Sequence, residues 1–413
     1  MPLKALSKSS QNQSKRTISK RVWVALVGFI FCLIVILNSG FIIHGEEETT
    51  VFSVERARVL SVVNDRLEPD PLVDNLYIGR QTLELELLSG THAGQQVRID
   101  NTLSRFFNHM ARDRMTLLVA IVENTDGSIA HVDVFGHVRD TFILGFIGLF
   151  FLILILVARL KGFYSVISLI FTMITVIYFL IPAILNGRNP ILFAVITAVL
   201  TAIFSILMIS DFTMKSLAAI GGTMIGVFIA GGISILAGSI ANISGMHISH
   251  AEEVLFQSGG LPIRIPQLLF AGIIIASLGA VIDVAMSIAS AVFEIKDVNP
   301  TMKVKELYKS GMNIGRDIVG TMSNTLILAF AGSSITILII IMSYRLPYTR
   351  LINLDILAVE VIQGISASIG LVLAVPITAL SASFLASDNK VTQFFRTKKC
   401  PNKGENVTRA LYK

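Results

Sequence analysis

Long runs of apolar residues dominate the chain, and their lengths predict helices that cross a membrane. A helix needs about 20 apolar residues to span about 30 Å of hydrocarbon. Eight segments reach or approach that length, so the sequence predicts an α-helical polytopic membrane protein with about eight transmembrane helices. The segments are residues 22–43, 141–158, 163–183, 190–210, 216–241, 267–291, 318–342 and 354–386. The last segment is long enough to be tilted, or to be kinked at Pro376.

Between the first two apolar segments, residues 44–140 show a different pattern, in which apolar and polar residues alternate. Stretches such as 83–87 and 129–134 alternate with period two, which is typical of strands with one buried face. Turn-forming sequences at 89–94 and 124–128 separate such stretches. The pattern predicts a small extracytoplasmic β-rich domain, a barrel or sandwich of about five or six strands. We expect this domain to capture a ligand, dock a partner, plug a pore mouth or act as a spacer.

The positions of Lys and Arg predict how the chain is oriented in the membrane. Residues 1–21 carry six basic residues and form a cytoplasmic tail, because positive charge beside an apolar segment stays inside. Eight crossings then place residues 44–140 outside the cytoplasm and return the basic tail 387–413 to it. We interpret the segment 22–43 as an uncleaved anchor, since its apolar run is longer than a signal-peptide core, and a cleaved signal peptide is the alternative.

The overall composition agrees with a membrane protein and excludes several other classes. Apolar residues make up 53% of the 413 residues and charged residues only 15%, with a formal net charge of +6. A soluble protein carries about 25% charged residues, because a surface in water needs polar groups. The composition therefore excludes an ordinary soluble enzyme, a disordered chain and a nucleic-acid binder. Two cysteines are too few for a disulfide framework.

Polar side chains interrupt three of the predicted helices, and these residues carry the candidate chemistry. A charge at the bilayer centre costs about 3 kcal/mol, so such residues are functional candidates by default. Within each helix, the candidates are spaced so that they share one face. They are Asp283 and Ser287 in the sixth predicted helix, Asp317, Thr321 and Asn324 at the start of the seventh, and Glu360 and Gln363 in the eighth. We expect Asp283 and Asn324 to meet at similar depth on neighbouring antiparallel helices.

Two interpretations fit these polar residues. In the first, they line a polar path for a proton, a cation or a small solute between the last three predicted helices. In the second, Asp283 is neutral and hydrogen-bonded to Asn324 or Ser323, so that the polar groups only join helices. Asp317 also suits the first turn of a helix, where a carboxylate stabilises the helix dipole. A hydrolase using Asp283 and Asp317 is disfavoured because the sequence shows no nucleophile with its base, so we expect no enzyme.

Small residues at four-residue spacing predict where helices pack closely. Gly222 and Gly226 lie in the fifth predicted helix, and Gly272 and Ala276 lie in the sixth. This spacing lets two helix backbones touch. Further glycines in the fifth helix leave open a second interpretation, in which that helix is broken and lines a cavity.

Two loops between predicted helices contain further candidates. In the outer loop, His247, His250 and Glu253 have a spacing that could bind Zn²⁺, but a short solvated helix over 250–258 is the simpler interpretation. We therefore expect no metal and no other cofactor.

The inner loop 292–316 contains a predicted amphipathic helix. Pro300 suits its first helical position, and Gly311 and Gly315 are expected to end it. Lysines on one face and apolar residues on the other suit an anionic lipid surface or a docking partner.

Three stretches of the sequence carry a resemblance to a known family. Residues 279–290 read Gly-Ala-Val-Ile-Asp-Val-Ala-Met-Ser-Ile-Ala-Ser, residues 314–329 read Ile-Gly-Arg-Asp-Ile-Val-Gly-Thr-Met-Ser-Asn-Thr-Leu-Ile-Leu-Ala, and residues 370–376 read Gly-Leu-Val-Leu-Ala-Val-Pro. With one anchor, one outer domain and a seven-helix domain over 141–386, the chain resembles the YibE/F-like family of bacterial multipass membrane proteins. The resemblance implies the bacterial cytoplasmic membrane as the location, and it carries no biochemical activity over.

The expected function is transport of a small solute or ion by a transporter or permease component. The alternative is a non-transport scaffold or assembly protein whose outer domain binds an envelope partner. Apart from the lipid bilayer, the partners that we expect are a second copy of the chain or a paralogous membrane protein. Because the sequence holds no Gly-x-x-x-x-Gly-Lys loop, we expect no nucleotide binding in this chain.

Overall fold

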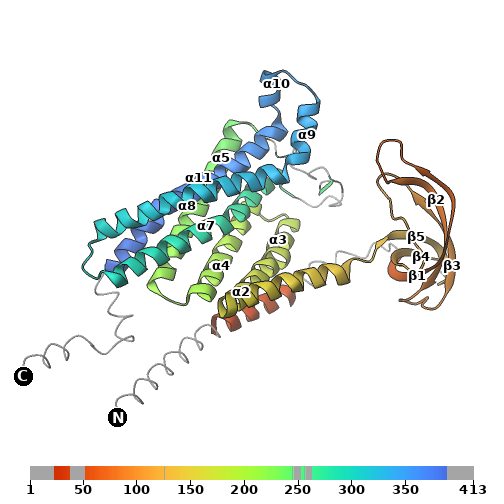
Figure 1. Ribbon diagram of the computed structural model, residues 1–413, viewed down its shortest axis with the longest axis horizontal. Helices are drawn as coiled ribbons and strands as arrows, with labels where there is room; N and C mark the ends of the chain where they lie inside the picture. The colour runs from red at the N-terminus through yellow and green to blue at the C-terminus, as the bar shows by residue number, and fades with distance from the viewer. Residues whose placement is uncertain are drawn as a thin grey trace, which may run out of the picture. The chain divides into compact units, whose positions relative to one another are not determined.

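The computed structural model describes residues 23–37, 52–124, 126–243, 245, 253–254, 256 and 263–387 (Figure 1). The chain divides into two compact units. One unit covers residues 44–156, and the other covers residues 1–43 together with 157–413.

The first unit is built on a five-stranded antiparallel sheet with the strand order β3-β2-β1-β4-β5. Its strands are β1 (Phe52–Pro69), β2 (Tyr77–Leu87), β3 (Gln96–Leu103), β4 (Thr116–Glu123) and β5 (Ile129–His137). Strand β1 is 18 residues long, so its first part pairs with β4 and its second part with β2. The edge strands β3 and β5 contact each other, which curls the sheet around a core. The predicted β-rich domain is therefore confirmed, with the first four strands forming a Greek key.

Alternating side chains fill the inside of the curled sheet, as the period-two pattern predicts. Leu83, Leu85 and Leu87 of β2 are fully buried, while Glu84 between them is exposed. Across the ladder, Val59 of β1 pairs with Leu85 and is also fully buried. The alternation thus places one face of each strand in an apolar core and the other in solvent.

The remaining structure is helical, and one long helix, α2, begins in the first unit and ends in the second. The helices are Trp23–Leu37, α2 (Asp140–Thr175), the π-helix η1 (Val176–Leu180), α3 (Ile181–Leu185), α4 (Pro190–Ser210), α5 (Met214–Ile240), α7 (Ile265–Val298), α8 (Val304–Ser333), α9 (Ile335–Ser343), α10 (Tyr348–Ile352) and α11 (Asp355–Ser387). The predicted segment 190–210 coincides with α4, and 354–386 differs from α11 by one residue at each end.

Among the described residues, five helical stretches are long and apolar enough to cross a membrane, and the bent pair α8 and α9 makes a sixth if it counts as one span. The expected mostly helical membrane protein is therefore confirmed, while the number of eight spans stays a prediction. Two of the predicted segments, 141–158 and 163–183, lie within one stretch of 46 residues, Asp140–Leu185. Arg159 interrupts this stretch with non-helical dihedral angles, φ 51° and ψ −128°, at the position of the predicted loop.

Helices α5, α7 and α11 pack against one another and form the centre of the helical unit, with α4 and α8 packed beside them (Figure 1). Helices α5 and α11 are in backbone contact. A Cβ atom added to Gly226 would lie 2.7 Å from the Ala374 Cβ, and one added to Gly370 would lie 2.8 Å from the Gly226 carbonyl oxygen. Gly222 likewise lies against Thr378. The absence of side chains at these glycines allows the two helices to approach this closely.

The structure corrects three local predictions. The amphipathic helix does not begin at Pro300, because α8 begins at Val304, where the Lys303 backbone N–H donates to the Glu306 carboxylate at 2.9 Å. Gly311 and Gly315 do not end that helix. Both are buried inside it, against α7 and α11, where a larger side chain would not fit.

The predicted helix 318–342 is not continuous, since it breaks at Ser334 with a bend of 62° between α8 and α9. In contrast, α11 continues through Pro376, and whether it is tilted or kinked there stays a prediction. Most of the predicted helix 250–258 lies outside the described residues.

Candidate functional site

The break between α8 and α9 places a buried hydroxyl group within an apolar part of the helical unit. Ser334 separates the two helices and is only 5% exposed. Its backbone N–H donates to the Phe330 carbonyl at 3.0 Å, and its carbonyl accepts from Leu338 N at 3.0 Å. The backbone is therefore anchored on both sides of the bend, and the Ser334 side chain is free to bond across to another helix.

The partner of this hydroxyl group is the carboxylate of Glu360 on α11, which accepts a hydrogen bond from Ser334 Oγ. Glu360 is half-buried and lies in the second turn of α11. One turn further along, Gly364 faces the ring of Phe330, with an added Cβ atom 3.7 Å from Phe330 Cδ2. This contact holds the end of α8 against α11, so the acid and the break stay together. Gln363 is half-buried and lies three residues after Glu360 on the same face.

A second set of polar residues lies on α7, on a face that no other described helix covers. Asp283 and Ser287 are exposed, and so are Gly272, Ala276 and Gly279 on the same stripe of the helix. A Cβ atom added to Gly272 or Gly279 would meet nothing within 4 Å. Gly272 and Ala276 therefore do not pack within the chain, in contrast to Gly222 and Gly226 on α5. This surface, Gly272–Ala276–Gly279–Asp283–Ser287, is called the α7 stripe below.

Helix α8 carries the third set. Asp317, Thr321 and Asn324 are all exposed, and the Thr321 hydroxyl donates to the Ile318 carbonyl at 3.0 Å. Contacts of Gly315 with Ile288 and of Gly311 with Val292 fix the antiparallel register of α7 and α8. In this register Asn324 lies level with Gly279, about 6 Å along the axis from Asp283 at 1.5 Å per residue.

The structure thus brings together only part of the predicted polar path. Glu360 meets the helix break and Gln363 lies one turn away, whereas, in the part of the chain that the structure describes, no hydrogen bond joins Asp283 to Asn324. The break itself was missed by the sequence analysis. Its signal is the sequence Ala331-Gly332-Ser333-Ser334 in an otherwise apolar run, since Gly and Ser pairs are frequent kink sites.

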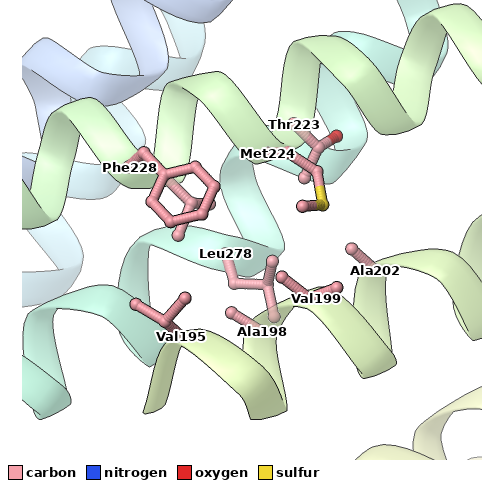
Figure 2. A pocket seen from close by; sticks show the side chains of 9 residues that line it. Val195, Ala198, Val199, Ala202, Thr223, Met224, Phe228 and Leu278 are labelled. Carbon is pink, nitrogen blue, oxygen red and sulfur yellow. The ribbon is translucent and has the colours of Figure 1, made fainter. Parts of the chain in front are cut away.

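A small cavity lies between α4, α5 and α7, where Figure 2 shows apolar side chains around Thr223 and Met224. Its volume is about 10 Å³, close to the minimum that one water molecule needs. The Thr223 hydroxyl lines it and has no hydrogen-bond partner in the described structure. The cavity has the size for one water molecule and is too small for a transported solute.

Two of the three candidate metal ligands, His247 and His250, lie outside the described residues, so the structure does not test this site. Glu253 falls in a short described piece of helix. Over the described ranges, no group of three or more His, Cys, Asp or Glu side chains is placed to hold a metal ion.

In the sheet unit, one buried carboxylate joins two loops. Asp70 follows β1 and accepts hydrogen bonds from Arg105 Nε at 2.5 Å and from the backbone N–H of Leu72 at 2.7 Å. The Arg105 hydrogen bond, supported by the backbone donors, holds the pKa of Asp70 below its ordinary value. Beside this pair, the loops expose four apolar side chains to solvent. They are Leu72 (76% exposed), Val73 (46%), Phe106 (94%) and Phe107 (71%), which together are called the apolar tip.

Two histidines lie together, His109 from the loop between β3 and β4 and His137 from the end of β5. The rings of His109 and His137 pack edge to face, with centroids 5.7 Å apart. The His137 Nδ1 atom is buried and has no partner in the described structure. Burial lowers the pKa of His137, and the nearby His109 and Arg139 lower it further.

Comparison with known proteins identifies a family that the chain matches. Residues 146–388, more than half of the chain, match the family model described as YibE/F-like protein. No curated protein and no solved structure matches this chain. The matched range covers α4 to α11, so it includes Glu360, the helix break and the α7 stripe.

Proposed function

This chain belongs to the YibE/F-like family, and we propose that it acts in the bacterial cytoplasmic membrane as a transporter or permease component. The observation that carries the proposal is the hydrogen bond between Glu360 and Ser334 at the break between α8 and α9. Discontinuous helices with an ionisable residue at the break form the ion and substrate sites of many secondary transporters. The proposed cargo is a small solute or ion, and the proposal includes no catalytic step and no cofactor.

In this mechanism Glu360 is the group that binds and releases the charge. In the proposed mechanism, the ionised carboxylate accepts a hydrogen bond from the Ser334 hydroxyl group. A proton or cation that binds to the carboxylate replaces this hydrogen bond. The bend of 62° marks the point where α8 ends and α9 begins, next to the Glu360 carboxylate. Gln363, one turn away, supplies an amide that hydrogen-bonds a hydrated cargo.

The proposed arrangement in the membrane has eight spans, with both termini in the cytoplasm and the sheet domain outside. The break at Arg159 supports it, because it divides the stretch Asp140–Leu185 into two segments that are each long enough to span. Helix Trp23–Leu37, a shorter apolar helix, is the described part of the proposed first span, and α8 with α9 is the proposed seventh span as one bent helix.

We further propose that a second membrane chain, another copy or a paralogous partner, covers the α7 stripe. Asp283 is exposed within an apolar helix, and leaving it against lipid costs about 3 kcal/mol. Small residues beside it allow a partner helix to approach closely enough to hydrogen-bond the carboxyl group. Helix α8 adds the polar groups of Asp317, Thr321 and Asn324. In this proposal they line the polar path or take part in the contact with the second chain.

The transport proposal is tested on the full chain in proteoliposomes that contain a trapped pH-sensitive dye. A potassium diffusion potential set with valinomycin drives proton entry, and parallel assays use gradients of Na⁺ and Mn²⁺ with trapped dyes that respond to those ions. We expect flux of at least one of these ions, reduced about tenfold or more in Glu360→Gln. The matched control is Asp355→Asn, at the start of the same helix, which should retain the flux. Equal flux in Glu360→Gln would overturn the proposal, and absence of flux with all three ions would overturn the version in which the cargo is one of these ions.

The apolar tip favours a second candidate function, in which the chain is a scaffold whose sheet domain binds an envelope partner. Aromatic side chains that are 71% to 94% exposed on fixed loops are typical of contact surfaces. The test is co-sedimentation of the full chain in nanodiscs with purified cell-wall sacculi, comparing Phe106→Ser/Phe107→Ser with the unmodified chain. If the double variant loses binding to sacculi and keeps its ion flux, the apolar tip is the binding surface of a scaffold. Equal sedimentation of the variant and the unmodified chain would exclude this function for the tip.

A further inference from the structure

A cavity of about 320 Å³ lies between helix Trp23–Leu37 and the segment formed by η1, α3 and α4. Its walls are almost entirely apolar. Phe31 and Val35 come from the first helix, Phe179 from η1 and Phe193 from α4. Its volume falls within the range of small-molecule sites in proteins, which are about 300–1,000 Å³.

The local backbone explains why the helices do not close this space. Residues Val176–Leu180 form a π-helix, in which the Ile181 N–H bonds to the Val176 carbonyl, and Pro182 follows directly. A π-helix carries an extra residue per turn and occurs frequently at functional sites. The Phe179 ring lies close to two other aromatic rings of the cavity wall. Its centroid is 6.0 Å from that of Phe31 and 5.5 Å from that of Phe193.

The cavity has one charged residue, Arg188, at its rim. The guanidinium group lies 5.5 Å from the centroid of the Phe193 ring and is exposed. Within the described part of the chain it has no carboxylate partner. Asn186, also at the rim, donates one of its two amide hydrogens to the Pro182 carbonyl at 2.8 Å, so the other remains available.

We propose that this cavity binds one anionic phospholipid, with an acyl chain against the aromatic wall and the phosphate at Arg188. The position suits a lipid, because Arg188 and Asn186 lie in the short connection between Leu185, which ends one apolar stretch, and Pro190, which begins α4. Such connections lie at the level of the headgroups. The N-terminus of α4 does not compete for the phosphate, since the Asn189 side chain already accepts from Ile191 N and Leu192 N. This proposal is independent of transport.

The experiment measures bound lipid on the full chain by native mass spectrometry after equilibration with equal amounts of dioleoyl phosphatidylglycerol and dioleoyl phosphatidylcholine. We expect the chain to retain the anionic lipid, and Arg188→Gln to lower its ratio to the zwitterionic lipid about fivefold, as expected for one surface arginine. Arg264→Gln, at the start of α7, is the matched control and should leave the ratio unchanged.

A second variant separates the acyl-chain site from the headgroup site. Ala183→Phe fills the cavity from α3 and should remove both lipids, whereas Arg188→Gln affects only the anionic one. Glycerol 3-phosphate, which has the headgroup chemistry without acyl chains, should not displace the bound lipid. Equal retention of the two lipids by the unmodified chain, an unchanged ratio in Arg188→Gln, or displacement by glycerol 3-phosphate would each overturn the proposal.

Discussion

Asp70 shows how one carboxylate fixes the shape of a surface far along the chain. It is buried, and it bonds Arg105 from a loop 35 residues away as well as the backbone of its own loop. We expect Asp70→Asn to increase hydrogen exchange several-fold in residues 70–76 and 104–108, because the amide cannot replace the ionised acceptor. Asp133→Asn, an exposed acid on β5, is the control.

The pH dependence of the same loops follows from the depressed pKa of Asp70. A carboxylate whose pKa is lowered by folding stabilises the fold above its unfolded value of about 3.9, and this stability is lost as the pH falls through the folded value. The loops should therefore keep their exchange protection from neutral pH down to about pH 4. Loss of protection already at pH 6 would contradict this assignment.

The lowered pKa of His137 predicts that the stability of the sheet domain also changes with pH, in a higher pH range than for Asp70. Its pKa is lowered by burial, so the unfolded chain binds a proton more readily than the folded sheet does. The sheet domain should be fully stable above about pH 6.5 and lose stability as the pH falls below that value. His137→Gln should weaken this dependence in exchange measurements between pH 7.5 and pH 5. His131→Gln, at an exposed position, should retain it, and an identical slope in both variants would argue against the assignment.

At the scale of helices, the close contact of α5 with α11 predicts a strong dependence on side-chain size. Gly226→Ala places a methyl group 2.7 Å from the Ala374 Cβ and 3.1 Å from the Gly370 carbonyl, so the helices must move apart. We expect a loss of about 1–3 kcal/mol in the free energy of unfolding, seen as a lower melting temperature in detergent. Gly232→Ala, on the same helix with nothing within 4 Å, should be neutral or stabilising. Equal melting temperatures would show that the contact is not tight.

The same helices show what the sequence can and cannot predict. The bounds of α4 and α11 follow from the lengths of apolar runs, and the strands follow from period-two alternation, because burial of whole faces determines both patterns. Gly311 and Gly315 were expected to end a helix, yet they lie in its interior. A glycine that ends a helix and one that admits a neighbouring helix are identical in sequence, and only tertiary contacts distinguish them.

The candidate site shows the same limit. Glu360 is recognisable as an acid in an apolar segment, but its partner Ser334 is 26 residues away and belongs to a helix that was expected to be continuous. Similarly, Asp283 and Asn324 are recognisable in the sequence as polar residues in apolar segments. Their relative positions along the helix axes depend on the register between α7 and α8, which the contacts of Gly311 and Gly315 set. Packing between helices, which no local pattern encodes, decides which polar groups meet.

At the scale of the whole molecule, the helical unit covers most of its small residues but leaves the α7 stripe open. The stripe combines three features that membranes rarely tolerate together on a lipid-facing surface, namely an acid, a hydroxyl group and a row of small residues. A second copy fits this surface well, since a carboxyl group and a hydroxyl group each both donate and accept hydrogen bonds. A two-fold contact pairs the same surface patch on both chains.

This argument predicts a cross-link that depends on the stripe. With Cys32 and Cys400 replaced by Ser, Ala276→Cys should give disulfide-linked dimers under mild oxidation in native membranes. Leu236→Cys, 61% exposed on α5, is the control for random collisions and should stay monomeric. Asp283→Leu should weaken the Ala276→Cys cross-link, since it removes the hydrogen-bonding group of the interface. Equal cross-linking at both positions would show that the stripe faces lipid or water, and a cross-link of Ala276→Cys only to a different protein would identify a paralogous partner as the covering chain.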